Sequence, residues 1–483
     1  MRIIINMQNT IGWNFDNSYL NLSKMMTSQV SPVPVKDPKI ILYNARLAKE
    51  LGLNFSSLSK DQQALIFSGN IIPEGTIPWA EAYAGHQFGH FVMLGDGRAI
   101  VLGEHIAPGK QRFDIQLKGS GKTPYSRGGD GRAALGPMLR EYIISEAIHY
   151  LKIPTTRSLA VVATGQDVMR ETILPGAILT RVASSHIRVG TFEFVAAQKD
   201  VGALQELIMY CIDRHYPELK GEKIPALKLF RAVMQKHADL IMHYMRIGFI
   251  HGVLNTDNVA ISGESIDYGP CAFMDAYDPK TKFSSIDHQG RYAYGNQAKI
   301  AQWNMARFAE TLLPLIDVDL NKSIEILEKE IADFADVYGA KSLDMMRGKL
   351  GIQAGDEEED HFFIKELLEW MHGNQADYTN TFRDLMNENL NSPIYQNEEF
   401  QVWHTKFIKK NPDKNIMQQY NPVLIPRNHK VEEALEAAHQ NNLDPLHKLL
   451  EVLEQPYEEN SKVSEYQSPA PTTETPYQTF CGT

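Results

Sequence analysis

The stretch His251-Gly-Val-Leu-Asn-Thr-Asp-Asn258 decides the fold of this chain. It follows a helical pattern, since apolar residues between Leu229 and Met245 recur at intervals of three and four and Gly248 ends the run. Nine residues after Asn258 comes Asp267-Tyr268-Gly269. The Asn258 amide and the Asp267 carboxylate supply hard oxygen atoms, which Mg²⁺ prefers. The two segments therefore predict a metal site close to the end of a long helix.

The order of residues in this stretch is similar to the protein-kinase catalytic loop, H-R-D-L-x-x-x-N. His251, Leu254 and Asn258 stand at matching places, but Val253 stands where a kinase has its catalytic aspartate. Asp257 is the carboxylate within the loop, so it is the candidate replacement for that base. A turn carboxylate of the Asx type fits Asp257 equally well. The pattern indicates a kinase-like nucleotide site with altered chemistry.

Short apolar runs among glycines predict strands at 91–94, 99–103 and 113–118. A helix is expected from about Pro137 to Leu151, before Pro154. The last strand alternates, so that one face holds Phe113, Ile115 and Leu117 and the other holds Asp114, Gln116 and Lys118.

Lys118 ends a strand, as does the kinase lysine that contacts phosphate oxygens and pairs with a helix glutamate. Glu141 lies 23 residues later, inside the expected helix, and Glu146 is its rival. The alternative for the lysine and for both glutamates is a solvated surface position. The joint match with the downstream loop favours a functional pair of Lys118 and Glu141.

Other segments give simpler expectations. Residues 38–51 predict a short helix that ends at Gly52. Segments 259–261 and 265–267 predict a hairpin directly after the catalytic loop. Residues 300–455 have a mostly helical pattern, and residues 456–480, rich in Pro, Ser, Thr and Glu, predict disorder.

Strands with one helix, followed by helices around the loop, predict an α+β, two-lobed protein-kinase-like fold. A length of 483 residues allows more than one core. We expect a strand-rich N-lobe and a helical C-lobe, with an N-terminal extension and a helical C-terminal extension. The expected divisions are the N-terminal extension at 1–75, the N-lobe at 76–200, the C-lobe at 201–340, the helical extension at 341–455 and a flexible tail at 456–483.

The charge of the chain argues against nucleic acid as a partner. Lys and Arg number 48 and Asp and Glu 59, for a net charge of −11, whereas a nucleic-acid binder needs a cationic surface. Residues 95–190 are nevertheless rich in Arg and Lys, which predicts a local pocket for a small anionic ligand.

Two short turns fall within this basic region. Gly95-Asp-Gly-Arg98 recurs as Gly129-Asp-Gly-Arg132, and each can present backbone amides and an arginine. Arg181 and Arg188 add guanidinium groups that suit phosphate oxygens, although any one of them also fits a surface arginine. The run Gly119–Thr123 fails the P-loop pattern, because Gln116 stands where that motif requires a glycine.

Location and cysteine chemistry follow from composition. The chain has no run of 18 apolar residues and its start is too short in apolar residues for a secretory signal, so we expect no membrane span and a cytoplasmic location. Three cysteines form no disulfide framework. Cys211 is expected in the core, while Cys271 and Cys481 fit either two unpaired thiols or a pair that clips the tail across the site.

Four stretches together resemble the selenoprotein O family (SelO, called YdiU in bacteria), over nearly the whole chain. They are Trp79–His90, Leu117–Arg127, His251–Asn258 and Gly290–Gln297. The resemblance implies a kinase fold without the catalytic aspartate, ATP bound in a reversed orientation, and transfer of AMP to protein hydroxyls. UMP transfer with Mn²⁺ is also attributed to bacterial members.

The resemblance also implies roles for single residues. Asn258 and Asp267 would hold Mg²⁺ or Mn²⁺, Asp257 would be the active-site carboxylate, and Glu141 would pair with Lys118. Cys481 stands where some relatives carry selenocysteine, and the family's regulatory disulfide maps onto Cys271 and Cys481. The implied nucleotide ligands are Gly95, Gly97, Arg98, Lys118, Asp130, Gly131, Arg181, Arg188 and Asp267.

The expected partners are ATP, with UTP as an open alternative, and proteins that offer Ser, Thr or Tyr hydroxyls. Two other functions fit the same residues. One is an ordinary protein kinase that uses Asp257 as its base. The other is a non-catalytic scaffold that binds ATP and uses the helical region 300–455 as a partner surface.

Overall fold

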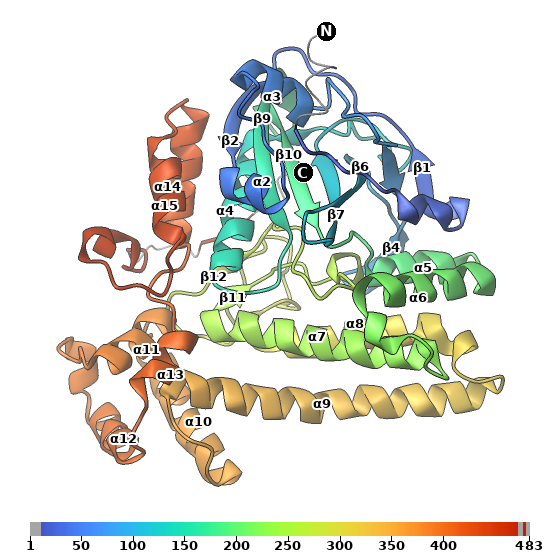
Figure 1. Ribbon diagram of the computed structural model, residues 1–483. Helices are drawn as coiled ribbons and strands as arrows, with labels where there is room; N and C mark the ends of the chain where they lie inside the picture. Colours follow the sequence, from blue (N-terminus) through green and yellow to red (C-terminus); the bar gives the residue numbers. More distant parts are fainter. Residues whose placement is uncertain (1–10, 472–476, 480–483) are drawn as a thin grey trace.

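The computed structural model describes residues 11–471 and 477–479. Its N-terminal part is built on an antiparallel sheet, and its C-terminal part is helical (Figure 1). Within the described residues the main sheet has eight strands in the order β1-β3-β6-β7-β10-β9-β2, with β8 beside β10. The strands are β1 (Thr27–Gln29), β2 (Lys39–Tyr43), β3 (Trp79–Glu81), β4 (Ala84–Gln87), β5 (His90–Met93), β6 (Ala99–Ile106), β7 (Arg112–Lys118), β8 (Ala133–Ala134), β9 (Arg157–Met169), β10 (Ile173–Ala183), β11 (Phe249–Ile250) and β12 (Ala272–Phe273).

The helices divide between the two parts. Helix α4 packs on β9 and β10, while α7 and the long α9 lie side by side beneath the sheet (Figure 1). The helices are α2 (Ala45–Glu50), α3 (Lys60–Phe67), α4 (Leu135–Tyr150), α5 (Val189–Ala197), α6 (Val201–His215), α7 (Pro225–Ile247), α8 (Gln297–Leu312), α9 (Leu320–Leu350), α10 (Glu357–Gly373), α11 (Tyr378–Asn387), α12 (Glu398–Lys409), α13 (Lys414–Tyr420), α14 (Asn428–His439) and α15 (Asp444–Leu453). The prediction of an α+β fold with a strand-rich N-terminal lobe and a helical C-terminal lobe is confirmed.

Strand β7 carries the predicted alternation, but neither of its faces is open to water. Ile115 and Leu117 pack in an apolar cluster with Phe67 and Ile178. On the opposite face Lys118 is only 8% exposed. The solvated alternative for this lysine is therefore excluded, and its charge requires partners inside the protein.

The prediction of a helix at 38–51 is wrong for its first half and correct for its second half. Residues Lys39–Tyr43 form β2, which pairs with β9, and α2 begins only at Ala45. The Asn44 side chain accepts a hydrogen bond from the backbone N–H of Leu47 and so caps the helix. The run Ile40–Leu42 takes the extended form because it can pair with the strand Arg157–Met169, which lies far away in sequence.

The hairpin expected directly after the catalytic loop is also wrong. Ala260 forms an isolated bridge with Arg188, and Ser265 forms one with Thr155. The short strand that does pair beside the loop is β11, with β12. Segments 259–261 and 265–267 thus satisfy their backbone groups against the N-terminal half, and this fixes the loop between the two parts of the molecule.

The described residues of the tail, 456–471 and 477–479, make hydrogen bonds with the rest of the protein, although the sequence predicts that they are disordered. Arg246 donates to the Tyr457 hydroxyl at 2.7 Å, and Arg427 donates to the carbonyl of Gln467 at 2.8 Å. Thr479 donates its backbone N–H to the carbonyl of Phe283 at 2.8 Å.

The five divisions of the chain stay predictions, as does the cytoplasmic location. Within residues 11–471 and 477–479, every helix is too short or too polar to span a membrane.

Candidate functional site

A cavity of about 730 Å³ opens where the sheet meets the catalytic loop. It brings together residues from Tyr83 to Pro270, because the start of β6, the end of β7 and Arg181 of β10 all meet the catalytic loop at its wall. Every residue proposed from sequence as a nucleotide or metal ligand lines it, as does the candidate base. These residues are Gly95, Gly97, Arg98, Lys118, Asp130, Gly131, Arg181, Arg188, Asp257, Asn258 and Asp267.

The cavity is cationic although the protein is acidic. Seven basic side chains line it, against four carboxylates. Low-dielectric walls strengthen the field of such a cluster. An anion with several negative charges, such as a triphosphate, therefore fits this cavity better than a neutral ligand does. The basic residues are Arg98, Lys118, Arg127, Arg132, Arg170, Arg181 and Arg188, and the acidic ones are Asp96, Asp130, Asp257 and Asp267.

Asp267 lies at the centre of the cations. Its carboxylate is 2.8 Å from Lys118 Nζ, 2.5 Å from Arg181 and 3.2 Å from Arg188. Burial raises the pKa of Asp267, but the cations of Arg181, Lys118 and Arg188 outweigh it and hold the pKa well below its ordinary value. The backbone of Asp267 has a φ of +63°, a conformation that non-glycine residues seldom adopt. The Asp267 carboxylate is thus held in its ionised form, in a position fixed at some backbone cost.

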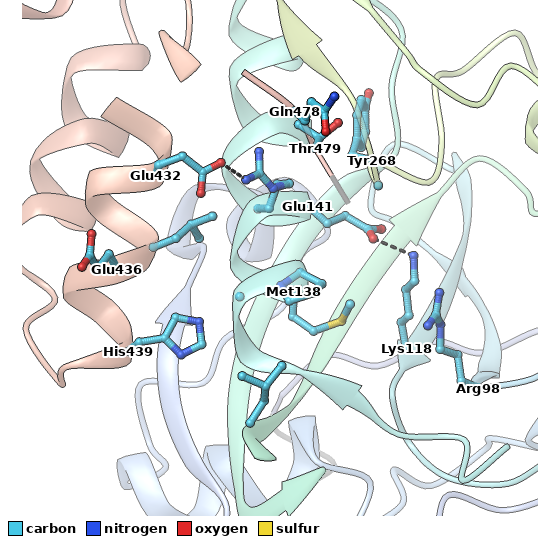
Figure 2. Close-up of a pocket in the computed structure, with 16 residues that line it drawn as sticks. Arg98, Lys118, Met138, Glu141, Tyr268, Glu432, Glu436, His439, Gln478 and Thr479 are labelled. Carbon is cyan, nitrogen blue, oxygen red and sulfur yellow. Dashed lines mark hydrogen bonds and ion pairs between the residues drawn. The ribbon is translucent and has the colours of Figure 1, made fainter. Parts of the chain in front are cut away.

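The Lys118 ammonium joins Asp267 to helix α4. Its Nζ lies 2.7 Å from Glu141 Oε2, and Figure 2 shows this ion pair beside Arg98. Arg181 Nε donates to the other Glu141 oxygen at 2.8 Å. The rival, Glu146, instead binds Arg157 at 2.7 Å. The geometry therefore selects Glu141 and gives Glu146 a separate structural role.

Arg98 is half-buried and differs from the buried cations of Lys118, Arg181 and Arg188. It forms no ion pair within the described residues 11–471 and 477–479, and burial lowers its pKa. It stands between the main cavity and a neighbouring one of about 550 Å³, which runs along α4 to Glu432 and His439 of α14 (Figure 2). A half-buried guanidinium that forms no ion pair with the described carboxylates is available to bind an anionic ligand.

Asp257 has the opposite surroundings to Asp267. Its side chain is buried, its Oδ2 accepts from Gln87 Nε2 at 3.3 Å, and its Oδ1 has no hydrogen-bond partner among the residues that the structure describes. Burial raises the pKa of Asp257 to about 6, although Arg188 and Gln87 act in the other direction. A carboxylate with one free oxygen and a pKa near neutrality is suited to accept a proton.

The donor set also suits a divalent metal ion. The Asn258 amide nitrogen donates to the carbonyl of Val253 at 2.8 Å, so the amide oxygen is the atom left for a ligand. With the Asp267 carboxylate and the free Oδ1 of Asp257, the available atoms are hard oxygens. Mg²⁺ and Mn²⁺ prefer such atoms over nitrogen or sulfur.

Comparison with known proteins identifies the family of this chain. The family model described as "Protein adenylyltransferase SelO" matches residues 9–454. The chain belongs to the SelO/YdiU family. The proteins of Pelagibacter ubique and Nitrosococcus oceani, each called "Protein nucleotidyltransferase YdiU", are 54% and 55% identical to it over 98% of this chain and 100% and 98% of their own lengths. As a member of the SelO/YdiU family the chain is a nucleotidyltransferase with a nucleotide substrate.

A search of solved structures found ROP2 of Toxoplasma gondii, described as "a virulence factor with a protein-kinase fold and no enzymatic activity". It is 10% identical and the match covers 68% of this chain and 86% of that one, with a TM-score of 0.23. A score of this size carries no weight beside the SelO/YdiU match.

Some residues in and around the cavity were not singled out from the sequence. The ring of Tyr83 lies 4.4 Å from the Arg188 guanidinium, and Gln87 holds Asp257. Both fall in the quoted stretch Trp79–His90, so a signal existed. Arg170, which lines the cavity and pairs with Asp130 at 3.0 Å, lies at the end of β9 without any motif. Cys211 is buried as expected, whereas Cys481 lies outside the described residues, so its pairing with Cys271 stays a prediction.

Proposed function

We propose that this protein transfers AMP from ATP to Ser, Thr or Tyr hydroxyls of other proteins, with Mg²⁺ or Mn²⁺, and releases pyrophosphate. One observation carries the proposal: a carboxylate with a free oxygen, Asp257, shares a cavity with a cluster of cations, while Val253 fills the place of the kinase base. The cations suit the triphosphate, and the carboxylate suits the incoming hydroxyl.

In the proposed reaction the substrate oxygen attacks the α-phosphorus, and the bond from that phosphorus to the β-phosphate oxygen breaks. The hydroxyl proton passes to the Asp257 carboxylate. Arg98, Lys118 and Arg181 take up the charge of the pyrophosphate as it leaves. Transfers of this kind depend mostly on positioning and on charge neutralisation.

The remaining roles follow from the same geometry. A divalent ion held by Asn258 and Asp267 would neutralise charge on the phosphate oxygens. Arg188 binds the backbone carbonyl of Asp257 at 3.0 Å as well as Asp267, and so links the base to the cation cluster. Gly95, Gly97, Asp130 and Gly131 would form the loops around the nucleotide.

Two relatives of this reaction use the same residues. Transfer of UMP from UTP would be the same reaction with uracil in place of adenine as the nucleobase. A protein kinase would also use Asp257 as base, but with the γ-phosphorus facing it. A scaffold that binds ATP without chemistry is the third candidate.

The purified protein, incubated in parallel with α-³²P-ATP and γ-³²P-ATP and with Mg²⁺ or Mn²⁺, separates these cases. Label from the α-phosphate alone, with a mass gain equal to AMP, is the expected result. Label from γ alone would replace the proposal with a kinase, and ATP binding without any label would replace it with a scaffold. The same assay with α-³²P-UTP tests UMP transfer.

A further inference from the structure

The carboxylate of Glu193, on helix α5, touches two segments that flank Asp257. Its Oε2 accepts from the Thr256 hydroxyl at 2.7 Å, and its Oε1 lies 2.5 Å from His86 Nδ1. Glu193 is only 4% exposed and Thr256 is fully buried. Thr256 directly precedes Asp257 in the catalytic loop, and His86 belongs to β4. One buried side chain of α5 thus binds both the β4–β5 hairpin and the loop.

The hairpin and the loop are further joined to each other. His86 donates its backbone N–H to the Thr256 hydroxyl oxygen at 2.8 Å. Because Thr256 gives its own proton to Glu193, this hydroxyl is both donor and acceptor and has one preferred rotation. Gln87, the next residue of β4, donates to Asp257 Oδ2. His86 and Thr256, which both bind Glu193, therefore directly precede the two residues of the Gln87–Asp257 hydrogen bond in the sequence.

The backbone at this junction leaves no space for adjustment. A Cβ placed on Gly85 would lie 2.6 Å from Asp257 Oδ1, and one on Gly190 of α5 would lie 2.1 Å from the carbonyl oxygen of Ala84. Helix α5, the hairpin and the loop are thus in direct contact. A displacement of any one of them moves Asp257.

We infer that Glu193 is a positioning residue for the transfer reaction: by binding His86 and Thr256 at once, it sets where the Asp257 carboxylate lies. Glu193, His86 and Thr256 do not line the cavity within the described residues, so they act through Asp257 and not on the nucleotide. The inference rests on the proposed role of Asp257. A misplacement of about 1 Å can cost a reaction on the order of 100-fold.

The test compares three variants by steady-state transfer of α-³²P label. Glu193→Ala removes both contacts and should lower kcat by roughly 10- to 100-fold, with little change in the KM for ATP. Thr256→Val keeps the shape of Thr256 but removes its hydroxyl, and should lower kcat to the same extent. Glu193→Gln should restore most of the activity, because its amide can accept from Thr256 and donate to the other tautomer of His86. The double variant Glu193→Ala/Thr256→Val should lose no more than either single one.

Glu146→Ala is the matched control, since Glu146 is equally buried but binds Arg157 on another part of the fold. It should lower the melting temperature and leave kcat nearly unchanged. An equal loss of kcat in this control, an unchanged kcat in Glu193→Ala, or a Glu193→Gln as inactive as Glu193→Ala would each overturn the inference. If Glu193→Ala does not fold, Thr256→Val decides by itself.

Hydrogen–deuterium exchange separates this inference from the proposed function. In Glu193→Ala the amides of residues 84–93 and 251–258 should exchange faster, and in Glu146→Ala they should not. This result is expected even from a protein that transfers no label, in which case only the proposed function fails. Unchanged exchange at 251–258 in a folded Glu193→Ala would overturn the positioning role.

Discussion

Asp267 and Asp257 line the same cavity ten residues apart in sequence, and desolvation acts to raise the pKa of both, yet their pKa values move in opposite directions. Asp267 has three cations within 3.2 Å. Asp257 has one weak amide donor at Oδ2, and Arg188 reaches its backbone carbonyl instead of its carboxylate. The difference shows that the partners of a buried carboxylate, and not burial alone, decide whether it holds a cation or accepts a proton.

The strongest challenge to this comparison is Asp267→Ala. Transfer of AMP should fall below detection, because the metal loses its charged ligand while Lys118, Arg181 and Arg188 lose their shared counter-ion. ATP binding measured in EDTA should be retained or become tighter, since the three cations no longer have a competing carboxylate. Full metal-dependent activity in this variant would remove Asp267 from the metal site.

Asp257→Asn tests the other side of the cavity. It preserves the shape and the contact with Gln87 but removes the proton acceptor, so kcat should fall by about 10²–10⁴-fold. The affinity for ATP should change little, because the cation cluster is intact. A kcat within twofold of the wild type would mean that Asp257 is the turn carboxylate that its spacing also allows.

Lys118→Ala tests whether the cations around Asp267 contribute to the use of ATP. Loss of a charge-assisted hydrogen bond costs about 1.5–3 kcal/mol, so kcat/KM for ATP should fall roughly 10- to 100-fold. Glu141→Gln should act in the same direction and Glu146→Gln should not, because only Glu141 binds the lysine. Unchanged kinetics in Lys118→Ala would refute the role of this residue.

The smallest expected effect concerns the segment after Asp267. Oxidation should link Cys271 to Cys481 and alter the rate of transfer, and Cys481→Ser should abolish the difference between oxidised and reduced protein. Peptide mass mapping of the oxidised protein is the direct measurement. Two free thiols in that map would end the prediction.

The sequence could predict the cavity because its chemistry sits in short motifs. The spacing of His251, Asn258 and Asp267 predicts the catalytic loop, and the alternating pattern that ends at Lys118 predicts that this lysine lies at the end of a strand. The choice between Glu141 and Glu146 needed the structure, since both are buried on α4 and only their partners differ.

The errors share one physical cause. Lys39–Tyr43 becomes a strand because β9 pairs with it, and segments 259–261 and 265–267 bind Arg188 and Thr155 instead of each other. Such pairings join residues far apart in sequence, so local propensity cannot report them. The contact of Glu193 with His86 and Thr256 was missed for the same reason.

The backbone contacts of residues 477–479 bear on how the protein is made. The hydroxyl of Thr479 donates to the carbonyl of Pro270, across 209 positions of the chain. At a synthesis rate of about 5–20 residues per second, the ribosome needs roughly 10–40 s to join the two ends of that contact. During this interval Pro270, close to Asp267 in sequence, has been made but its partner Thr479 has not, so the newborn chain passes through a stage in which this contact beside the cavity is missing.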